Sequence, residues 1–68
     1  MSTFSIRLRE LRTEHNMSMK QLAKLINTTD AAISNWENGV NEPKLSYIVS
    51  LSKVFNVTAD YLLGLSDT

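Results

Sequence analysis

The spacing of apolar residues is the feature that most limits the folds open to this chain. Phe4, Leu8 and Leu11 recur at intervals of four and three. The same intervals return further along the chain, in Leu45, Ile48, Leu51 and Phe55. Such intervals place side chains on one face of a helix, whereas a half-buried strand would need strict alternation. No segment is a strand candidate of any length, so we expect an all-α fold.

Helix-start signals set the limits of the first two helices. The first helix is expected from Phe4 to about His15. Ser18 is followed three residues later by Gln21, which is a capping box, so the second helix should begin near Met19. The inward positions of this second helix are Leu22, Ala23 and Ile26.

A polar cluster separates the second helix from the third. Asn27 can adopt the left-handed backbone conformation that a tight turn between helices needs. Thr29 is a good N-cap, and Asp30 would lie in the first turn, at the positive end of the helix dipole. The third helix should therefore run from Asp30 to about Asn38 and end at Gly39.

The remainder of the chain predicts a loop and two more helices. Residues 39–43 have the composition of a loop, and the apolar series after them marks the fourth helix. Thr58 would cap a short fifth helix that carries Tyr61, Leu62 and Leu65. The 68 residues leave room for one domain, over residues 1–68, and without cysteine its stability must come from helix packing.

Charge is unevenly distributed, although the net charge is zero. Residues 1–26 hold five Arg and Lys against two Glu, while residues 27–43 hold three acidic residues and no basic one. A nucleic-acid-binding domain usually has a basic surplus, which this chain lacks. No apolar run approaches the roughly 20 residues that span a bilayer, and no signal peptide is recognisable, so we expect a soluble, cytoplasmic protein.

The second and third helices with their short turn, over about residues 19–38, form a predicted helix-turn-helix. The segments LRELR, SMKQLAKLINTTDAAISNWENG and EPKLSYIVSLSKVFNVTADYLLGL, between Leu8 and Leu65, resemble the Cro-like (XRE) family of phage repressors almost end to end. The motif positions of that family fall on Leu22, Ala23, Asn27, Ile33, Trp36 and the closing Glu37-Asn38-Gly39. The resemblance implies a compact, five-helix, lambda-repressor-like DNA-binding domain.

The resemblance also implies how the motif meets DNA, with the start of the third helix in the major groove. Its outward side chains are then the predicted base contacts: Asp30, Ala31, Ser34 and Asn35. Asn35 suits a bidentate contact to adenine, Ala31 a thymine methyl group, and Asp30 the exocyclic amine of cytosine. Capping alone would also explain Asp30. Ser34 has three open roles, as a base contact, a phosphate contact or a solvated surface residue.

Phosphate contacts are expected around this helix, because they position a protein on the duplex. The predicted contacts are Ser18, Lys20, Thr29, Asn38, Asn41 and Lys44. Lys20 and Lys24 have an alternative explanation, since charges on an exposed helix face are usually only solvated. The chain departs from the family pattern in two places: Met19 replaces a frequent glutamine, and Val40-Asn41-Glu42 replaces a loop that is often basic. Fewer neutralised phosphates would make the salt dependence of binding shallower.

Three residues that suggest a functional role are interpreted as structural. Trp36 is spaced three residues from Ile33, which places it on the core face rather than against a base. Arg12 could be taken for a phosphate contact and Glu37 for a catalytic acid. They resemble a family pair that forms a salt bridge between helices, and we interpret them in that way.

A single motif would bind weakly, so we expect a dimer on a palindromic operator, with recognition helices about 34 Å apart. Val57, Thr58 and Tyr61 resemble the region where related domains meet, although apolar residues at a helix junction are more often core. The leading hypothesis is a repressor that excludes RNA polymerase from an overlapping promoter. The alternative is a protein-interaction module, such as an antitoxin or an antirepressor partner.

An enzyme is not expected from this sequence. It has one histidine, no cysteine, no glycine-rich phosphate loop and no plausible pair of catalytic carboxylates. We accordingly expect no metal, cofactor or small-molecule ligand, and double-stranded DNA as the partner.

Overall fold

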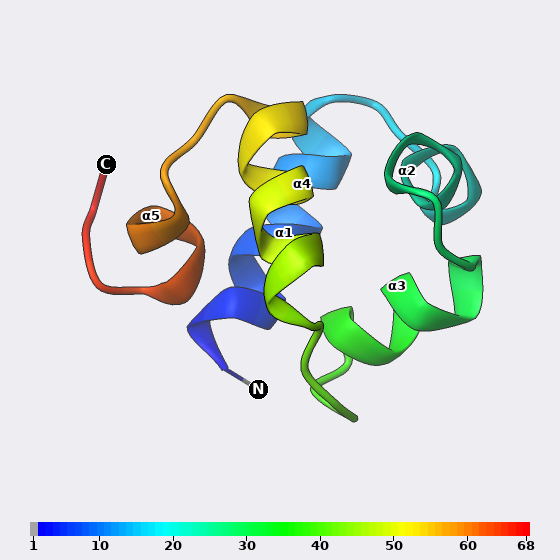
Figure 1. Cartoon of the computed structure of the whole chain (residues 1–68), viewed down its shortest axis with the longest axis horizontal. Coiled ribbons are helices and arrows are strands. Elements are labelled where there is room, and N and C mark those ends of the chain that lie inside the picture. Colours follow the sequence, from blue (N-terminus) through cyan, green and yellow to red (C-terminus); the bar gives the residue numbers. More distant parts are fainter. Residues whose placement is uncertain (1) are drawn as a thin grey trace.

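Five α-helices and no strand make up residues 2–68, which are the residues that the computed structural model describes. The helices are α1 (Thr3–Glu14), α2 (Met19–Ile26), α3 (Asp30–Glu37), α4 (Leu45–Phe55) and α5 (Ala59–Leu63). In Figure 1, α4 lies in front of α1, with α2 and α3 on one side of this pair and α5 on the other. The predicted all-α fold is confirmed.

The predicted caps form and explain where α2 and α3 begin. Ser18 Oγ accepts a hydrogen bond from the Gln21 backbone N–H (3.0 Å), and Gln21 Oε1 accepts one from the Ser18 N–H (2.8 Å). Asn27 ends α2 with φ 61° and ψ 51°, in the left-handed region. Thr29 Oγ1 then accepts from the Ala32 N–H and caps α3. The turn between the two helices therefore follows from local hydrogen bonds.

The predicted end of the last helix was wrong. We expected Leu65 in the fifth helix, but α5 stops at Leu63, and Leu65 is 75% exposed. Gly64 adopts φ 81°, a conformation that breaks the helix and that glycine tolerates. A Cβ at Gly64 would lie 2.9 Å from the Thr3 methyl carbon, so the close approach of α1 also requires glycine there.

The centre of the core receives one fully buried aliphatic side chain from each helix: Leu8, Leu22, Ile33, Leu51 and Leu62. Trp36 is also buried, as predicted, and its ring lies 5.2 Å from that of Tyr47 on α4. Burial of these side chains is the main contribution that can stabilise a chain this short without cross-links.

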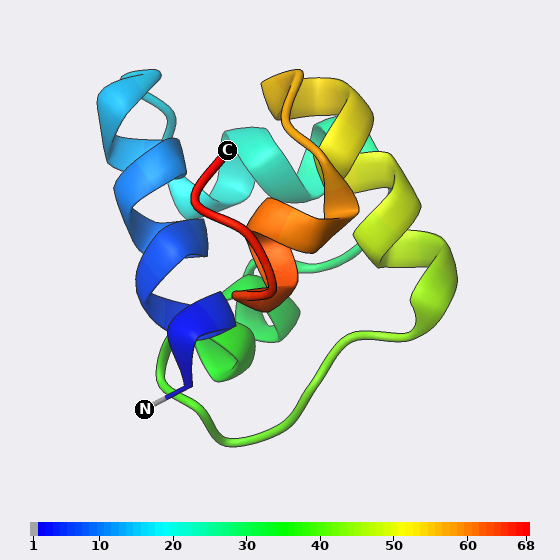
Figure 2. The same ribbon diagram turned by 90° about the vertical axis from the view of Figure 1, so that its left-hand side faces the viewer.

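The C-terminal segment folds back beside α5 and α1 (Figure 2). The Arg7 guanidinium lies 4.2 Å from the centre of the Tyr61 ring and donates to the backbone carbonyls of Tyr61 and Ser66. Arg7 Nη2 is also 3.8 Å from an Asp67 carboxylate oxygen. Arg7 therefore links α1 to the end of the chain. Within residues 2–68, no helix has both the length and the apolar character needed to cross a membrane.

Candidate nucleic-acid interface

α3 has two faces that differ in burial. Ile33, Trp36 and Glu37 face inward and are buried. The predicted base contacts lie on the other face, where Asp30 and Ala31 are exposed and Ser34 and Asn35 are half-buried. The four side chains therefore share one accessible surface along the helix, and the face opposite to them fixes its position.

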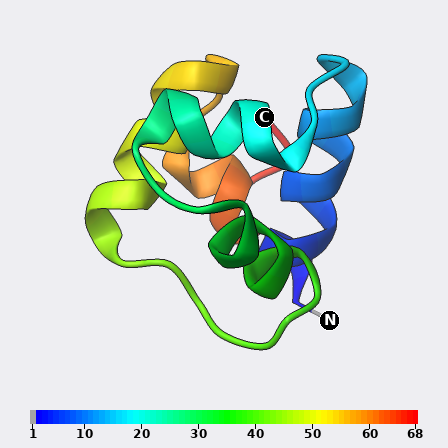
Figure 3. The same ribbon diagram turned by 90° about the vertical axis from the view of Figure 1, so that its right-hand side faces the viewer.

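α2 packs against α3, and Ala23 on α2 is buried, with 3% of its surface exposed. The Thr28 N–H donates to the Ala23 carbonyl (2.9 Å), which closes the end of α2 just before the turn. Figure 3 shows the molecule from the side on which α2 and α3 lie. A small side chain at position 23 permits this approach, and a larger one would force the helices apart.

A buried ion pair ties the C-terminal end of α3 to α1. Glu37 has no exposed surface, and its two carboxylate oxygens accept hydrogen bonds from Arg12 Nε (2.6 Å) and Arg12 Nη2 (3.0 Å). Arg12 Nη1 donates in addition to the Met17 carbonyl (2.9 Å). The hydrogen bond with Glu37 raises the pKa of Arg12 above its usual value, so this arginine is charged. The structure thus brings Arg12 and Glu37 together in a two-pronged contact.

Two further bonds reinforce this connection, and sequence analysis identified neither. Ser5 Oγ donates to the Trp36 carbonyl at 2.6 Å, within the buried interior. Arg9 Nε lies 3.4 Å from a Glu37 oxygen. Both pairs are separated by more than twenty residues, so no local pattern could have indicated them.

Asn38 connects Arg9 to the outer face of α3. Arg9 Nη2 donates to Asn38 Oδ1 (3.1 Å), and Asn38 Nδ2 donates to Ser34 Oγ (3.2 Å). Asn38 and Ser34 were predicted to touch DNA, and the structure shows that their side chains contact each other.

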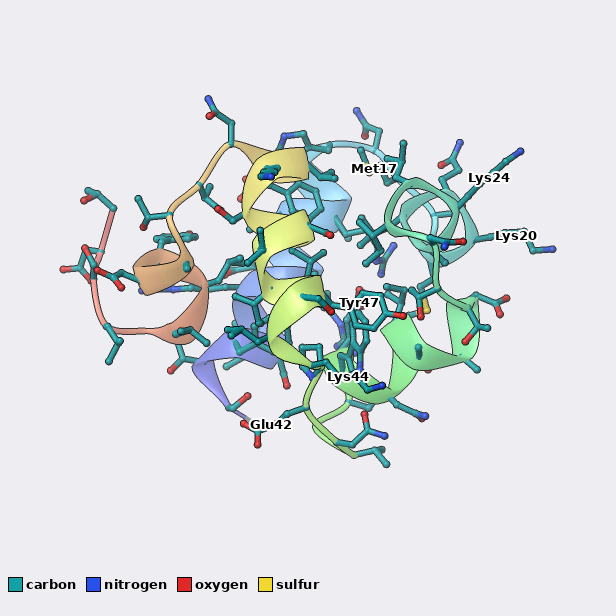
Figure 4. All side chains as sticks on the ribbon, viewed as in Figure 1. Met17, Lys20, Lys24, Glu42, Lys44 and Tyr47 are labelled. Atoms are coloured by element: carbon teal, nitrogen blue, oxygen red, sulfur yellow. The ribbon has the colours of Figure 1, made fainter. Side chains whose placement is uncertain are left out.

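The predicted phosphate contacts are all exposed. Ser18 and Thr29 use their oxygens as cap acceptors, which leaves their hydroxyl hydrogens available to donate. Lys20 and Lys24 point away from the body of the molecule along α2, and Lys44 stands at the start of α4 near Tyr47 (Figure 4).

The acidic residues of positions 27–43 are dispersed. Glu37 is buried against arginine, and Glu42 points away from α2, toward the N-terminal end of the chain (Figure 4). Asp30 remains on the outer face of α3, where its Oδ1 accepts from the Ala31 N–H (2.9 Å) as a first-turn cap. One of the three carboxylates therefore lies among the predicted base contacts.

The predicted dimer residues lie at the junction of α4 and α5. Val57 and Tyr61 are half-buried and pack against the core. Thr58 is exposed and caps α5 by accepting from the Tyr61 N–H (3.0 Å). In Figure 1, this junction lies across α1 and α4 from the helix-turn-helix.

The chain is similar in sequence to known transcriptional regulators. Residues 8–62 match a family model described as helix-turn-helix. Over 61 residues, the chain is 38% identical to the uncharacterized HTH-type transcriptional regulator YobD of Bacillus subtilis and 40% identical to the HTH-type transcriptional activator BcrR of Enterococcus faecalis. Each match takes in 90% of this chain but only 54% and 30%, respectively, of those relatives. The chain thus spans about half of the first relative and less of the second.

Solved structures of a phage protein share this arrangement of helices. The crystal structure of the P22 c2 repressor protein in complex with a synthetic operator matches with a TM-score of 0.87 and 30% identity, over 93% of this chain and 96% of that one. The solution structure of the DNA-binding domain of the same repressor matches with a TM-score of 0.83 and 33% identity, over 100% of this chain and 95% of that one. Repressor protein C2 of Salmonella phage P22 is 33% identical over 57 residues, which are 84% of this chain and 26% of the phage protein.

Proposed function

This chain belongs to the helix-turn-helix family that includes phage repressors, and from that premise we propose that it regulates transcription by sequence-specific binding of double-stranded DNA through α3. One observation carries the proposal: α3 presents an accessible row of polar and small side chains on a helix fixed from behind by the core and by Glu37. The likeness to a repressor in complex with its operator supports the same conclusion.

In the proposed complex, the N-terminal half of α3 enters the major groove. Asn35 contacts adenine through its donor and acceptor, Ala31 contacts a thymine methyl group, and Asp30 accepts from the amine of cytosine. Asp30 already accepts one bond from the Ala31 N–H, and its other carboxylate oxygen stays available. Ser34 completes the row of base contacts.

Phosphates on either side of the groove would bind the surrounding residues. Ser18 and Thr29 donate from their hydroxyls at the starts of α2 and α3, and Lys20 and Lys44 add positive charge. Asn38 and Asn41 extend this contact beyond the end of α3. These contacts position the motif but carry no sequence preference of their own.

We further propose a homodimer on a palindromic operator, because one motif covers too few base pairs for high specificity. The proposed contact between subunits uses Val57, Thr58 and Tyr61, and it places the two α3 helices about 34 Å apart. Bound over a promoter, such a dimer would exclude RNA polymerase, which makes the protein a repressor.

The acidic residues of positions 27–43 favour the alternative, a protein-interaction module. Only Asp30 of these lies among the predicted contacts, because Glu37 is paired with arginine inside the molecule and Glu42 points elsewhere. DNA is therefore the partner that we propose, and a protein partner becomes an outcome of the test.

The proposal is tested by selecting bound duplexes from a random DNA library with the wild-type chain. We expect a palindromic consensus whose half-site centres are about one helical turn apart. No enrichment by a sample shown to be folded would contradict DNA recognition and favour a protein partner. Enrichment of a single half-site would support DNA binding and contradict the dimer.

The contribution of Asn35 is tested by the variant Asn35→Ala in the same selection. Loss of a bidentate contact should reduce discrimination at one base pair by about 1–3 kcal/mol. Ser50→Ala is the matched control, because Ser50 lies on α4 and its hydroxyl donates to the Ser46 carbonyl of its own helix. An unchanged preference in Asn35→Ala would remove Asn35 from the recognition surface.

A further inference from the structure

The hydrogen bonds that join Arg9, Asn38 and Ser34 can run in only one direction. A guanidinium group donates and never accepts, so the atom of Asn38 that faces Arg9 must be the carbonyl oxygen. The amide nitrogen of Asn38 then faces Ser34, and an amide nitrogen also only donates. Ser34 Oγ is therefore the acceptor in this contact.

The hydroxyl hydrogen of Ser34 has no acceptor among residues 2–68. Two other hydroxyls within helices differ: Thr13 Oγ1 donates to the Arg9 carbonyl (2.9 Å), and Ser50 Oγ donates to the Ser46 carbonyl (3.2 Å). Ser34 makes no such bond to its own helix. Because it is half-buried on the outer face of α3, its hydrogen can turn toward a molecule that binds there.

The buried ion pair supports this chain of bonds from behind. Arg9 Nε lies 3.4 Å from an oxygen of Glu37, whose carboxylate is fully buried and also binds Arg12. The position of Arg9, and through it the orientation of the Asn38 amide, is thus coupled to the buried Arg12–Glu37 pair. A donor that is itself accepting a hydrogen bond is strengthened by polarisation.

We propose that Arg9 and Asn38 set Ser34 as a hydrogen-bond donor toward DNA, so that Ser34 selects a base with an acceptor in the major groove. The acceptors of this kind are O6 and N7 of guanine, N7 of adenine and O4 of thymine. The inference rests on the proposed function and specifies it further. Arg9 and Asn38 are positioning residues here, and the second hydrogen of Asn38 Nδ2 stays available for a phosphate.

The substitution Asn38→Asp tests the direction of the bonds. A carboxylate only accepts, so it would still receive the bond from Arg9 but would now take the hydroxyl hydrogen of Ser34 as well. Ser34 would then present its lone pairs to DNA. At one position, the wild type should prefer a base that offers an acceptor atom to Ser34. We expect the variant to prefer instead a base that offers a donor atom there, namely N4 of cytosine or N6 of adenine.

The measurement is the ratio of affinities for two duplexes that differ at that base pair, because the ratio cancels the general repulsion of an added carboxylate. Ser34→Ala should reduce the wild-type ratio by about two- to tenfold, as expected for one hydrogen bond. Arg9→Ala should reduce it by a smaller factor, and Arg9→Lys, which keeps a donor, should restore part of it. Asn41→Asp adds the same charge without contacting Ser34, so it should lower affinity and leave the ratio unchanged.

The outcomes separate this inference from the proposed function. If the folded wild-type chain shows no base preference at any position, sequence-specific recognition itself is overturned. If the wild type has a consensus but Ser34→Ala changes no ratio, or Asn38→Asp changes them no more than Asn41→Asp does, the role of Ser34 is overturned and the proposed function stands. A thermal melt of each variant checks folding, and Arg9→Ala and Ser34→Ala keep the test decisive if Asn38→Asp fails to fold.

Discussion

Glu37 carries a negative charge where no water reaches it. The free energy of removing a carboxylate from water is large, and it is offset here by three donor contacts from two arginines. The pair also positions the end of α3 against α1, which makes Glu37 important for the geometry of the proposed DNA-binding surface as well as for stability.

Removing the Glu37 carboxylate should be strongly destabilising. In Glu37→Ala, Arg12 loses its partner while its side chain stays mostly buried, so we expect the free energy of unfolding to fall by about 3–5 kcal/mol. Urea unfolding followed by circular dichroism measures the change. The double variant Arg12→Met with Glu37→Leu is the control, and it should recover much of the loss because no buried charge is left unpaired.

Because Arg12 stays charged near neutral pH, its own titration does not change the stabilisation that it provides by pairing with Glu37. Its raised pKa means that the stabilisation is fully present below the usual arginine value and is lost only when the pH rises above it. Through the neutral range, the titration of Arg12 should therefore add no slope to the stability of the protein.

At the scale of the elements, three left-handed asparagines define where helices end. Asn16, Asn27 and Asn56 have φ values of 54°, 61° and 54°. Asn27 and Asn56 are the C-caps of α2 and α4. Asparagine adopts this conformation more readily than other residues with a side chain, glycine excepted. The turn between α2 and α3 therefore includes one exposed residue, Asn27, that must adopt a left-handed backbone conformation.

Substitution of Asn27 should follow backbone preference rather than side-chain contacts. Asn27→Val places a β-branched residue at φ 61°, and we expect it to lower the free energy of unfolding by about 1–2 kcal/mol. Asn27→Gly should be tolerated, with stability close to that of the wild type. Thermal unfolding compares the two variants, and equal destabilisation by both would show that the asparagine side chain matters instead.

Sequence analysis predicted the elements well where the signals are local. The caps of α2 and α3 are formed by hydrogen bonds that span only three or four residues, at Ser18 with Gln21, Asn27 and Thr29. The order of these residues was therefore enough to predict the turn. The fifth helix was extended too far because Leu65 continues the apolar spacing, whereas the helix ends at the left-handed backbone of Gly64. The roles of Arg7 and Arg9 depend on contacts with distant segments, which no pattern in one sequence displays.

At the scale of the whole molecule, the arrangement of charge matters more than its zero sum. Lys20 and Lys24 extend from α2 and Lys44 stands at the start of α4, while the arginines of α1 are engaged within the protein. Few cations are thus free to neutralise phosphates. We therefore expect the affinity for DNA to fall less steeply with salt concentration than it does for basic relatives of the same fold.

Lys44→Ala tests this distribution. If Lys44 neutralises one phosphate, its removal should reduce the slope of log affinity against log salt by about 0.9 for each subunit. Lys53→Ala is a control of equal charge on the far end of α4. The measurement is a fluorescence anisotropy titration at several salt concentrations, and identical slopes for both variants would exclude a phosphate contact by Lys44.

The separation of α3 into a buried and an accessible face has an evolutionary consequence. Asp30, Ala31 and Asn35, the proposed base contacts, lie outside the buried interior. In the proposed function, a new DNA preference would therefore arise by single substitutions at these positions in duplicated copies of the gene. Ser34 is bound to Asn38 and, through it, to Arg9. A lineage that alters position 34 should therefore alter positions 38 and 9 with it, and aligned descendants would record these three sites as changing together.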